Sequence, residues 1–216
     1  MKNYDEIYRN QKLYWGAAPS DLIKKFAELA PVGQALDLGM GEGRDALYLA
    51  KQGFDVTGIE AAPAGVEKCL QLAAKHRLSL KAVTGDTRQF KIAKNRYSLI
   101  SAINLLQFLT KEEARALIAS IAAGLKKGGL FLCETFSIDD PHYQAHKKSS
   151  KEIAPGVFRD ANGRVYSLYD YSELFRMCSV DTLRLRPVHY SEYDYYDTSH
   201  GPGHWHGVVD LVAKKL

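Results

Sequence analysis

The chain has 216 residues, of which 46% are hydrophobic and 25% are charged, as is typical of a single globular domain with a buried core. Its formal net charge is +4 with no block of five like charges, so we expect neither a nucleic-acid nor a membrane partner. Three widely spaced cysteines without a CxxC pair argue against a disulfide framework and against a zinc finger.

The N-terminus is polar and lacks the apolar segment of a signal peptide. The longest apolar stretch, residues 99–109, contains three polar residues and is too short to cross a bilayer. These features predict a cytoplasmic protein.

Helical and strand patterns alternate along the first two thirds of the chain. Ser20 or Asp21 is a candidate N-cap for a helix that ends before Pro31. The expected strands then cover residues 34–38, 54–59, 78–83, 97–104 and 130–135, and the expected helices cover residues 44–52, 63–76 and 111–125. The last of these helices opens with a capping box at Thr110 and Glu113. This alternation predicts a doubly wound α/β sheet, mostly parallel, with helices on both faces.

The tail of the chain has a different pattern. Residues 137–166 are polar, with a tight turn expected at 160–163, and residues 171–178 read as a helix. Residues 182–193 and 207–214 read as two strands of an antiparallel hairpin. Since no linker or repeat divides the chain, we expect one domain over residues 1–216.

A glycine-rich loop follows the first expected strand. Gly39, Gly41 and Gly43 stand between that strand and a helix, where backbone can approach a ligand and helix amides can bind an anion. The dinucleotide fingerprint requires a small residue at position 44, but Arg44 stands there. Glu60 ends the second strand about twenty residues further on, where a carboxylate can accept both ribose hydroxyls. The alternatives are a tight turn without a ligand and a solvated strand-end charge.

Residues 35–45, ALDLGMGEGRD, resemble motif I of the class I S-adenosylmethionine-dependent methyltransferases. Residues 46–50 and 53–56 extend the similarity to the TehB-like, tellurite-resistance branch of that class, and the resemblance covers about residues 30–136. It implies a Rossmann-like sheet, S-adenosyl-L-methionine as cofactor and methyl transfer as activity.

The resemblance also implies a cofactor-binding set. Asp37 and the glycine loop would hold the methionine end, Glu60 the ribose, and Asp86 the adenine amino group. Asn104 would line the sulfonium and the acceptor. For Asp86 the alternative is an Asx-turn, and for Asn104 it is a polar group that merely ends a buried strand. The full set is Trp15, Asp37, Gly39, Met40, Gly41, Gly43, Glu60, Ala61, Asp86, Thr87 and Asn104.

We expect residues from both ends of the chain to form the acceptor site. In similar methyltransferases a segment like residues 1–19 folds over the cofactor as a lid, which favours that role for Trp15, whereas Tyr4 and Tyr8 fit a lid and core packing equally well. In the variable tail, residues 137–206, the candidate catalytic residues are His204 and His206, with His200 beside them. Structural hydrogen bonding, acceptor binding or general-base catalysis, and metal binding all remain open for them; no metal is expected.

Methyl transfer from a sulfonium is an in-line displacement that depends mainly on alignment, so it needs neither a metal nor a covalent nucleophile. We therefore expect a small-molecule acceptor with an oxyanion, thiol or other heteroatom. The TehB-like branch often carries a His-Arg pair in its tail, which is not intact here, and this departure puts a tellurium oxyanion in doubt. The rival hypotheses are a cofactor-binding sensor without turnover and a nicotinamide-dependent oxidoreductase, which Arg44 disfavours.

Overall fold

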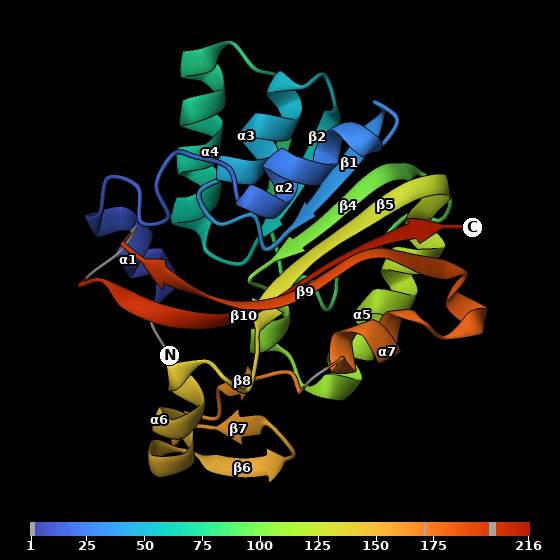
Figure 1. The fold of residues 1–216 in the computed structure, drawn as a ribbon. Helices are drawn as coiled ribbons and strands as arrows, with labels where there is room; N and C mark the ends of the chain where they lie inside the picture. Colours follow the sequence, from blue (N-terminus) through green and yellow to red (C-terminus); the bar gives the residue numbers. More distant parts are fainter. Residues whose placement is uncertain (1–2, 171, 199–201) are drawn as a thin grey trace.

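The computed structural model describes residues 3–170, 172–198 and 202–216. A seven-stranded sheet in the order β3-β2-β1-β4-β5-β10-β9 forms its centre (Figure 1). The strands β1 to β5 are parallel, while β10 pairs antiparallel with both β5 and β9. Their bounds are β1 (Gln34–Leu38), β2 (Asp55–Glu60), β3 (Lys81–Thr84), β4 (Tyr97–Ile103), β5 (Leu125–Phe136), β9 (Leu185–Asp197) and β10 (His204–Lys215). The predicted mostly parallel sheet with a C-terminal antiparallel hairpin is confirmed.

Helices cover both faces of this sheet. Side chains alternate along β5, so that Leu130 and Leu132 join one core cluster while Phe131 and Cys133 join the other. One cluster lies under α2 (Asp21–Phe26), η1 (Ala27–Leu29), α3 (Arg44–Lys51) and α4 (Pro63–His76). The other lies under η2 (Leu106–Phe108), α5 (Lys111–Gly124), α7 (Glu173–Cys178) and η3 (Asp181–Leu183).

Local signals account for several of these boundaries. The side chain of Ser20 accepts the amide of Ile23 at the start of α2, and Thr110 and Glu113 form both halves of the predicted capping box. Residues 126–129, which lie between the expected helix 111–125 and the expected strand 130–135, belong to β5 and form a bulge in it. The pairing with β4 passes from Tyr97–Leu125 to Leu99–Leu130, so the intervening residues bulge while the chain stays in the sheet.

The polar tail forms a small layer of its own beside the large sheet (Figure 1). It comprises α6 (Pro141–Ser149) and an antiparallel sheet of β6 (Lys151–Ala154), β7 (Val157–Arg159) and β8 (Val165–Ser167). Asp140 caps α6 by accepting the amide of His142, and the predicted turn at 160–163 joins β7 to β8, with Gly163 donating to Asp160. At the other end, α1 (Tyr4–Asn10) precedes the sheet. Among the described residues, no helix is both long and apolar enough to cross a membrane.

Candidate functional site

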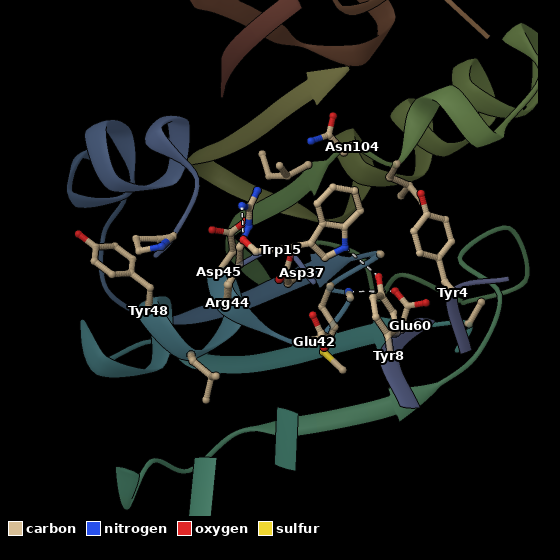
Figure 2. A pocket seen from close by; sticks show the side chains of 18 of the residues that line it. Tyr4, Tyr8, Trp15, Asp37, Glu42, Arg44, Asp45, Tyr48, Glu60 and Asn104 are labelled. Carbon is tan, nitrogen blue, oxygen red and sulfur yellow. Dashed lines mark hydrogen bonds and ion pairs between the residues drawn. The ribbon is translucent and has the colours of Figure 1, made fainter. Parts of the chain in front are cut away.

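The sheet reverses its strand order at β1, which lies between β2 and β4. Loops that leave the carboxyl ends of β1 and β4 diverge at such a switch point and open a crevice. A cavity of about 640 Å³ occupies this position (Figure 2). Ten of the eleven predicted cofactor residues line it: Trp15, Asp37, Gly39, Met40, Gly41, Glu60, Ala61, Asp86, Thr87 and Asn104.

Gly43 is the residue of that set that does not line the cavity. It has a φ of +88°, and a Cβ placed on it would lie 2.3 Å from the Sγ of Cys69 in α4. Glycine is therefore required here because α4 packs against the loop. Its contribution to the site is to keep the loop close to α4.

The glycine loop is anchored to β2 by backbone and side-chain hydrogen bonds. The amides of Gly39 and Met40 both donate to the carbonyl of Ile59. The amide of Gly41 donates to the Glu60 Oε2 at 2.9 Å, and the amide of Ala62 donates to Oε1 at 2.9 Å. Glu60 thus has a role that the sequence did not reveal: its carboxylate holds the glycine loop against the end of β2.

Burial raises the pKa of Glu60 above its ordinary value, and the backbone donors that it accepts offset part of that rise. Its carboxylate lines the cavity, and Figure 2 shows it beside Tyr8. A carboxylate can accept more than one hydrogen bond per oxygen, so these contacts leave Glu60 able to accept further donors from a ligand.

Asp37 is buried beneath the loop. Its Oδ1 accepts the hydroxyl of Ser101 at 2.8 Å, while its Oδ2 has no hydrogen-bond partner among the described residues. Burial, and secondly the nearby carboxylate of Asp45, raise its pKa to about 7. A buried acceptor left without a donor is rare in folded proteins, and this one lies at the wall of a cavity.

The N-terminal segment lies across the glycine loop and is held there by hydrogen bonds. The amide of Tyr14 donates to Glu42 at 2.6 Å, and Arg44 donates to the carbonyl of Trp15 at 3.2 Å. The indole Nε1 of Trp15 donates to the hydroxyl of Tyr8 at 3.0 Å, as Figure 2 shows. The sequence did not single out Glu42; its burial, at 3% exposure, is the signal that only the structure provides.

Asp86 makes the Asx-turn that was considered for it, and its carboxylate also accepts the guanidinium of Arg88. Its Oδ1 accepts the amide of Arg88 at 2.9 Å, which is an Asx-turn, and it also lines the cavity. The guanidinium of Arg88, which also pairs with Glu113, holds the pKa of Asp86 below its usual value. Thr87 beside it is buried.

Asn104 directly follows β4 and lies in the left-handed region, with a φ of 52°, a conformation that asparagine tolerates well. Its Nδ2 donates to the Oε1 of Glu134 at 2.9 Å, and its Oδ1 has no hydrogen-bond partner among the described residues. Burial, and secondly the cross-strand carboxylate of Asp210, raise the pKa of Glu134 to about 8. Glu134 lies inside an apolar strand, a position that the sequence pattern did not mark as functional.

A second cavity, of about 200 Å³, adjoins the first. The two share four lining residues: Tyr4, Trp15, Asn104 and Phe108. The wall beyond them includes the charged residues Asp160, Arg164 and Asp197 as well as aromatic rings and four histidines, namely Phe136, Phe158, Tyr166, Tyr195, His142, His146, His204 and His206. The predicted histidines of the tail therefore lie next to the large cavity; His200 lies outside the described residues.

Asp140 organises two of these histidines. Its Oδ2 lies 2.7 Å from the Nδ1 of His206, and its Oδ1 lies 2.7 Å from the Nδ1 of His142. Burial alone would raise the pKa of Asp140, but the hydrogen bonds from the two histidines outweigh it and lower the pKa to about 2. Because an ionised carboxylate only accepts, Nδ1 of each ring is the donor. Sequence reasoning missed Asp140, which is 66 residues from His206.

Comparisons with known proteins agree with this geometry. A family model described as "Methyltransferase domain" matches residues 35–129. Carboxy-S-adenosyl-L-methionine synthase of Photobacterium profundum is 31% identical over 76% of this chain and 69% of its own length. The chain belongs to the class I S-adenosylmethionine-dependent methyltransferase family.

The resemblance to the TehB-like branch is confirmed as well. The probable S-adenosyl-L-methionine-dependent methyltransferase TehB of Haemophilus influenzae is 26% identical over 62% of this chain and 47% of its own length. Hemagglutinin 1 of Eikenella corrodens is 32% identical over 77% of this chain and 54% of its own length. The chain therefore spans about half the length of these two relatives.

Solved structures show the same fold. An S-adenosylmethionine-dependent methyltransferase of Methanosarcina mazei superposes with a TM-score of 0.73 at 17% identity, covering 88% of this chain and 96% of that one. TehB of Haemophilus influenzae superposes with a TM-score of 0.69 at 20% identity, covering 100% of this chain and 68% of that one. The cofactor of this family is S-adenosyl-L-methionine.

Proposed function

We propose that this chain transfers a methyl group from S-adenosyl-L-methionine to a small-molecule nucleophile. The observation that carries the proposal is the junction of the two cavities. The large cavity lies at the switch point of the sheet, and the smaller one opens beside it at Trp15 and Asn104. A donor in one and an acceptor in the other would meet at these residues, and such alignment is the main requirement of methyl transfer.

The residues of the large cavity fit the cofactor. Asp37 offers an acceptor oxygen without a partner beside the glycine loop, as the ammonium of a methionine moiety requires. In this proposal Glu60 accepts the ribose hydroxyls and Asp86 accepts the adenine amino group, since both line the cavity. When bound, the cofactor supplies a methyl group on a sulfonium, which is a good leaving group.

The acceptor cavity indicates a small, flat acceptor with a heteroatom. Its volume is about 200 Å³, and aromatic rings form much of its wall. Aromatic faces favour planar substrates and the cationic methyl donor alike. We assign the handling of the acceptor's oxyanion, thiol or other heteroatom to His204 and His206, which line this cavity.

Residues 3–19 act in this proposal as a lid whose closed form is the one observed. Trp15 lies over Gly41, with its Cδ1 3.5 Å from where a Cβ of that residue would be. Its indole lines both cavities, and in this proposal it moves aside when the cofactor enters. Closure afterwards excludes water from the transfer.

The test is product formation from methyl-labelled donor. Tag-free protein is incubated with labelled S-adenosylmethionine and a panel of thiols, hydroxylated heteroaromatic compounds, tellurite and selenite. We expect S-adenosylhomocysteine and a labelled product with at least one heteroatom acceptor. Calorimetry with S-adenosylhomocysteine and with NADH decides the cofactor; binding of NADH alone would refute the proposal.

A second candidate function follows from the carboxy-S-adenosyl-L-methionine synthase relative: modification of the cofactor itself. Mass spectrometry of a reaction mixture that also contains a panel of carboxylic acids as carboxyl donors separates the two, since methyl transfer yields S-adenosylhomocysteine and a methylated acceptor, while this alternative yields a carboxylated cofactor. Tight cofactor binding without either product would indicate a sensor.

A further inference from the structure

A cluster of side chains of the types that bind metals lies in the wall of the acceptor cavity. Asp197 ends β9, and His204 and His206 begin the paired strand β10. One ligand atom from each of the three lies within 4.8 Å of the others. The rings of His204 and His206 are 4.6 Å apart at 74°. The register of the hairpin accounts for this, because His204 pairs directly with Asp197.

We propose that Asp197, His204 and His206 bind one divalent transition-metal ion, which activates the acceptor for methyl transfer. This inference rests on the proposed function for the role of the ion, but the site itself stands on the geometry of the three side chains. Two imidazoles and one carboxylate form a donor set typical of zinc and of non-haem iron. All three side chains line the acceptor cavity.

Both histidines are held in the orientation that a metal ligand needs. The Nδ1 of His206 contacts the Oδ2 of Asp140 at 2.7 Å, and the Nδ1 of His204 contacts the carbonyl of Pro202 at 2.8 Å. A carboxylate and a carbonyl are acceptors, so each Nδ1 carries the proton and each Nε2 keeps its lone pair. Histidines that bind metals almost always have this second hydrogen bond to a carboxylate or a backbone carbonyl.

The distance between the ligand atoms of His206 and Asp197 is compatible with one ion bound between them. The Nε2 of His206 lies 3.9 Å from the Oδ2 of Asp197, too far for a hydrogen bond between them. Ligand atoms bound to one tetrahedral zinc lie roughly 3.3 Å apart, given bonds of ~2.0–2.1 Å. The side chains of His206 and Asp197 are 4% and 9% exposed. A small inward shift therefore completes the site, while the neighbouring cavity leaves a position open for the acceptor.

Three protein ligands and an open position are the arrangement of a catalytic rather than a structural metal site. An acceptor hydroxyl or thiol bound there loses its proton to water, because the ion lowers the pKa of the bound group. The heteroatom lone pair then forms a bond to the methyl carbon while the carbon–sulfur bond breaks and its electron pair stays on sulfur. No oxidant or reductant takes part. The inference thus narrows the acceptor to a group that binds a metal through oxygen or sulfur.

Metal content tests the site directly. Tag-free protein is stripped with a chelator, dialysed against buffered free Zn²⁺ and analysed for zinc per chain. We expect one equivalent in the wild type and its loss in His204→Ala and Asp197→Asn. His189→Ala is the matched control, because His189 lies on β9 but packs against Phe26 and does not line the cavity. This variant should keep the zinc. Asp140→Asn should bind zinc ~10–100-fold more weakly.

Substitution of Co²⁺ into the wild-type protein provides a readout that does not depend on any variant folding. A strong visible absorption band, as from four-coordinate cobalt, supports the site. Zinc retained equally by His204→Ala, or no stoichiometric metal in the wild type, overturns it. Undiminished methyl transfer by metal-free protein overturns the activating role. Calorimetry with S-adenosylhomocysteine on the same stripped sample tests the proposed function separately, since the ligands of the ion lie outside the cofactor cavity.

Discussion

Replacing Asp37 by asparagine should change how the stability of the apo protein depends on pH. The buried carboxyl of Asp37 has its pKa raised from 3.8 to about 7. Because the folded-state pKa is raised, the stabilising contribution of its protonated form is complete below pH 3.8 and is lost as the pH rises through 7. A rise of this size corresponds to ~4 kcal/mol, of which roughly 3 kcal/mol falls between pH 5 and pH 8.

The asparagine variant cannot titrate at this position. The difference in free energy of unfolding, Asp37→Asn minus wild type, should therefore become more positive by up to ~3 kcal/mol between pH 5 and pH 8. Urea unfolding at the two pH values measures it, with exposed Asp55→Asn as the matched control on β2. The refuting result is a parallel pH dependence of the variant and the wild type, which would mean that Asp37 is already ionised in the apo protein.

The same substitution should weaken the binding of the cofactor. A cationic methionine moiety favours the ionised form of Asp37, so binding near pH 6.5 should release a proton from the wild type. Calorimetry in two buffers with different ionisation enthalpies detects that proton. In Asp37→Asn the proton release should disappear and the affinity for S-adenosylmethionine at pH 8 should fall by ~1.5–3 kcal/mol, the value of a hydrogen bond to a charged group. Proton release of equal size in both proteins would assign it to another group.

Two further predictions concern the loop. Glu60→Gln should weaken binding of S-adenosylhomocysteine by ~1.5–3 kcal/mol in calorimetry, because the amide cannot accept both the Gly41 and the Ala62 hydrogen bonds. The control variant, exposed Glu67→Gln on α4, should leave the affinity unchanged. Equal affinities for Glu60→Gln and the wild type would remove Glu60 from the cofactor site. Gly43→Ala should lower the free energy of unfolding by ~1–3 kcal/mol more than Gly53→Ala, since both have positive φ but only Gly43 meets Cys69. The double variant with Cys69→Ala should recover part of that loss in denaturant unfolding; no recovery would show that the clash is not the cause.

Ten of the eleven residues predicted for the cofactor line one cavity, because most of them lie at or next to strand ends. In a parallel sheet the carboxyl ends of neighbouring strands share one edge. Assigning the strands is therefore enough to predict that Asp37, Glu60 and Asn104 lie at the same edge. Gly43 is the exception within the set, since its role depends on how closely α4 packs. The start of β5 was harder to predict. Residues 126–129 include two glycines, as turns often do, yet pairing with β4 keeps them within the strand.

The arrangement of the smaller cavity, which we propose for the acceptor, could not be predicted without the tertiary structure. The sequence offered His204 and His206, but it did not indicate that Asp140 holds one of them or that Asp197 faces both. Those contacts come from a different layer and from the hairpin register, and neither leaves a periodic pattern in the chain. The sequence by itself thus determined the sheet, its switch point and the cofactor. Only the tertiary structure decided which side chains surround the smaller cavity that we propose for the acceptor, because that wall is assembled from segments far apart in sequence whose packing is not set by local propensity.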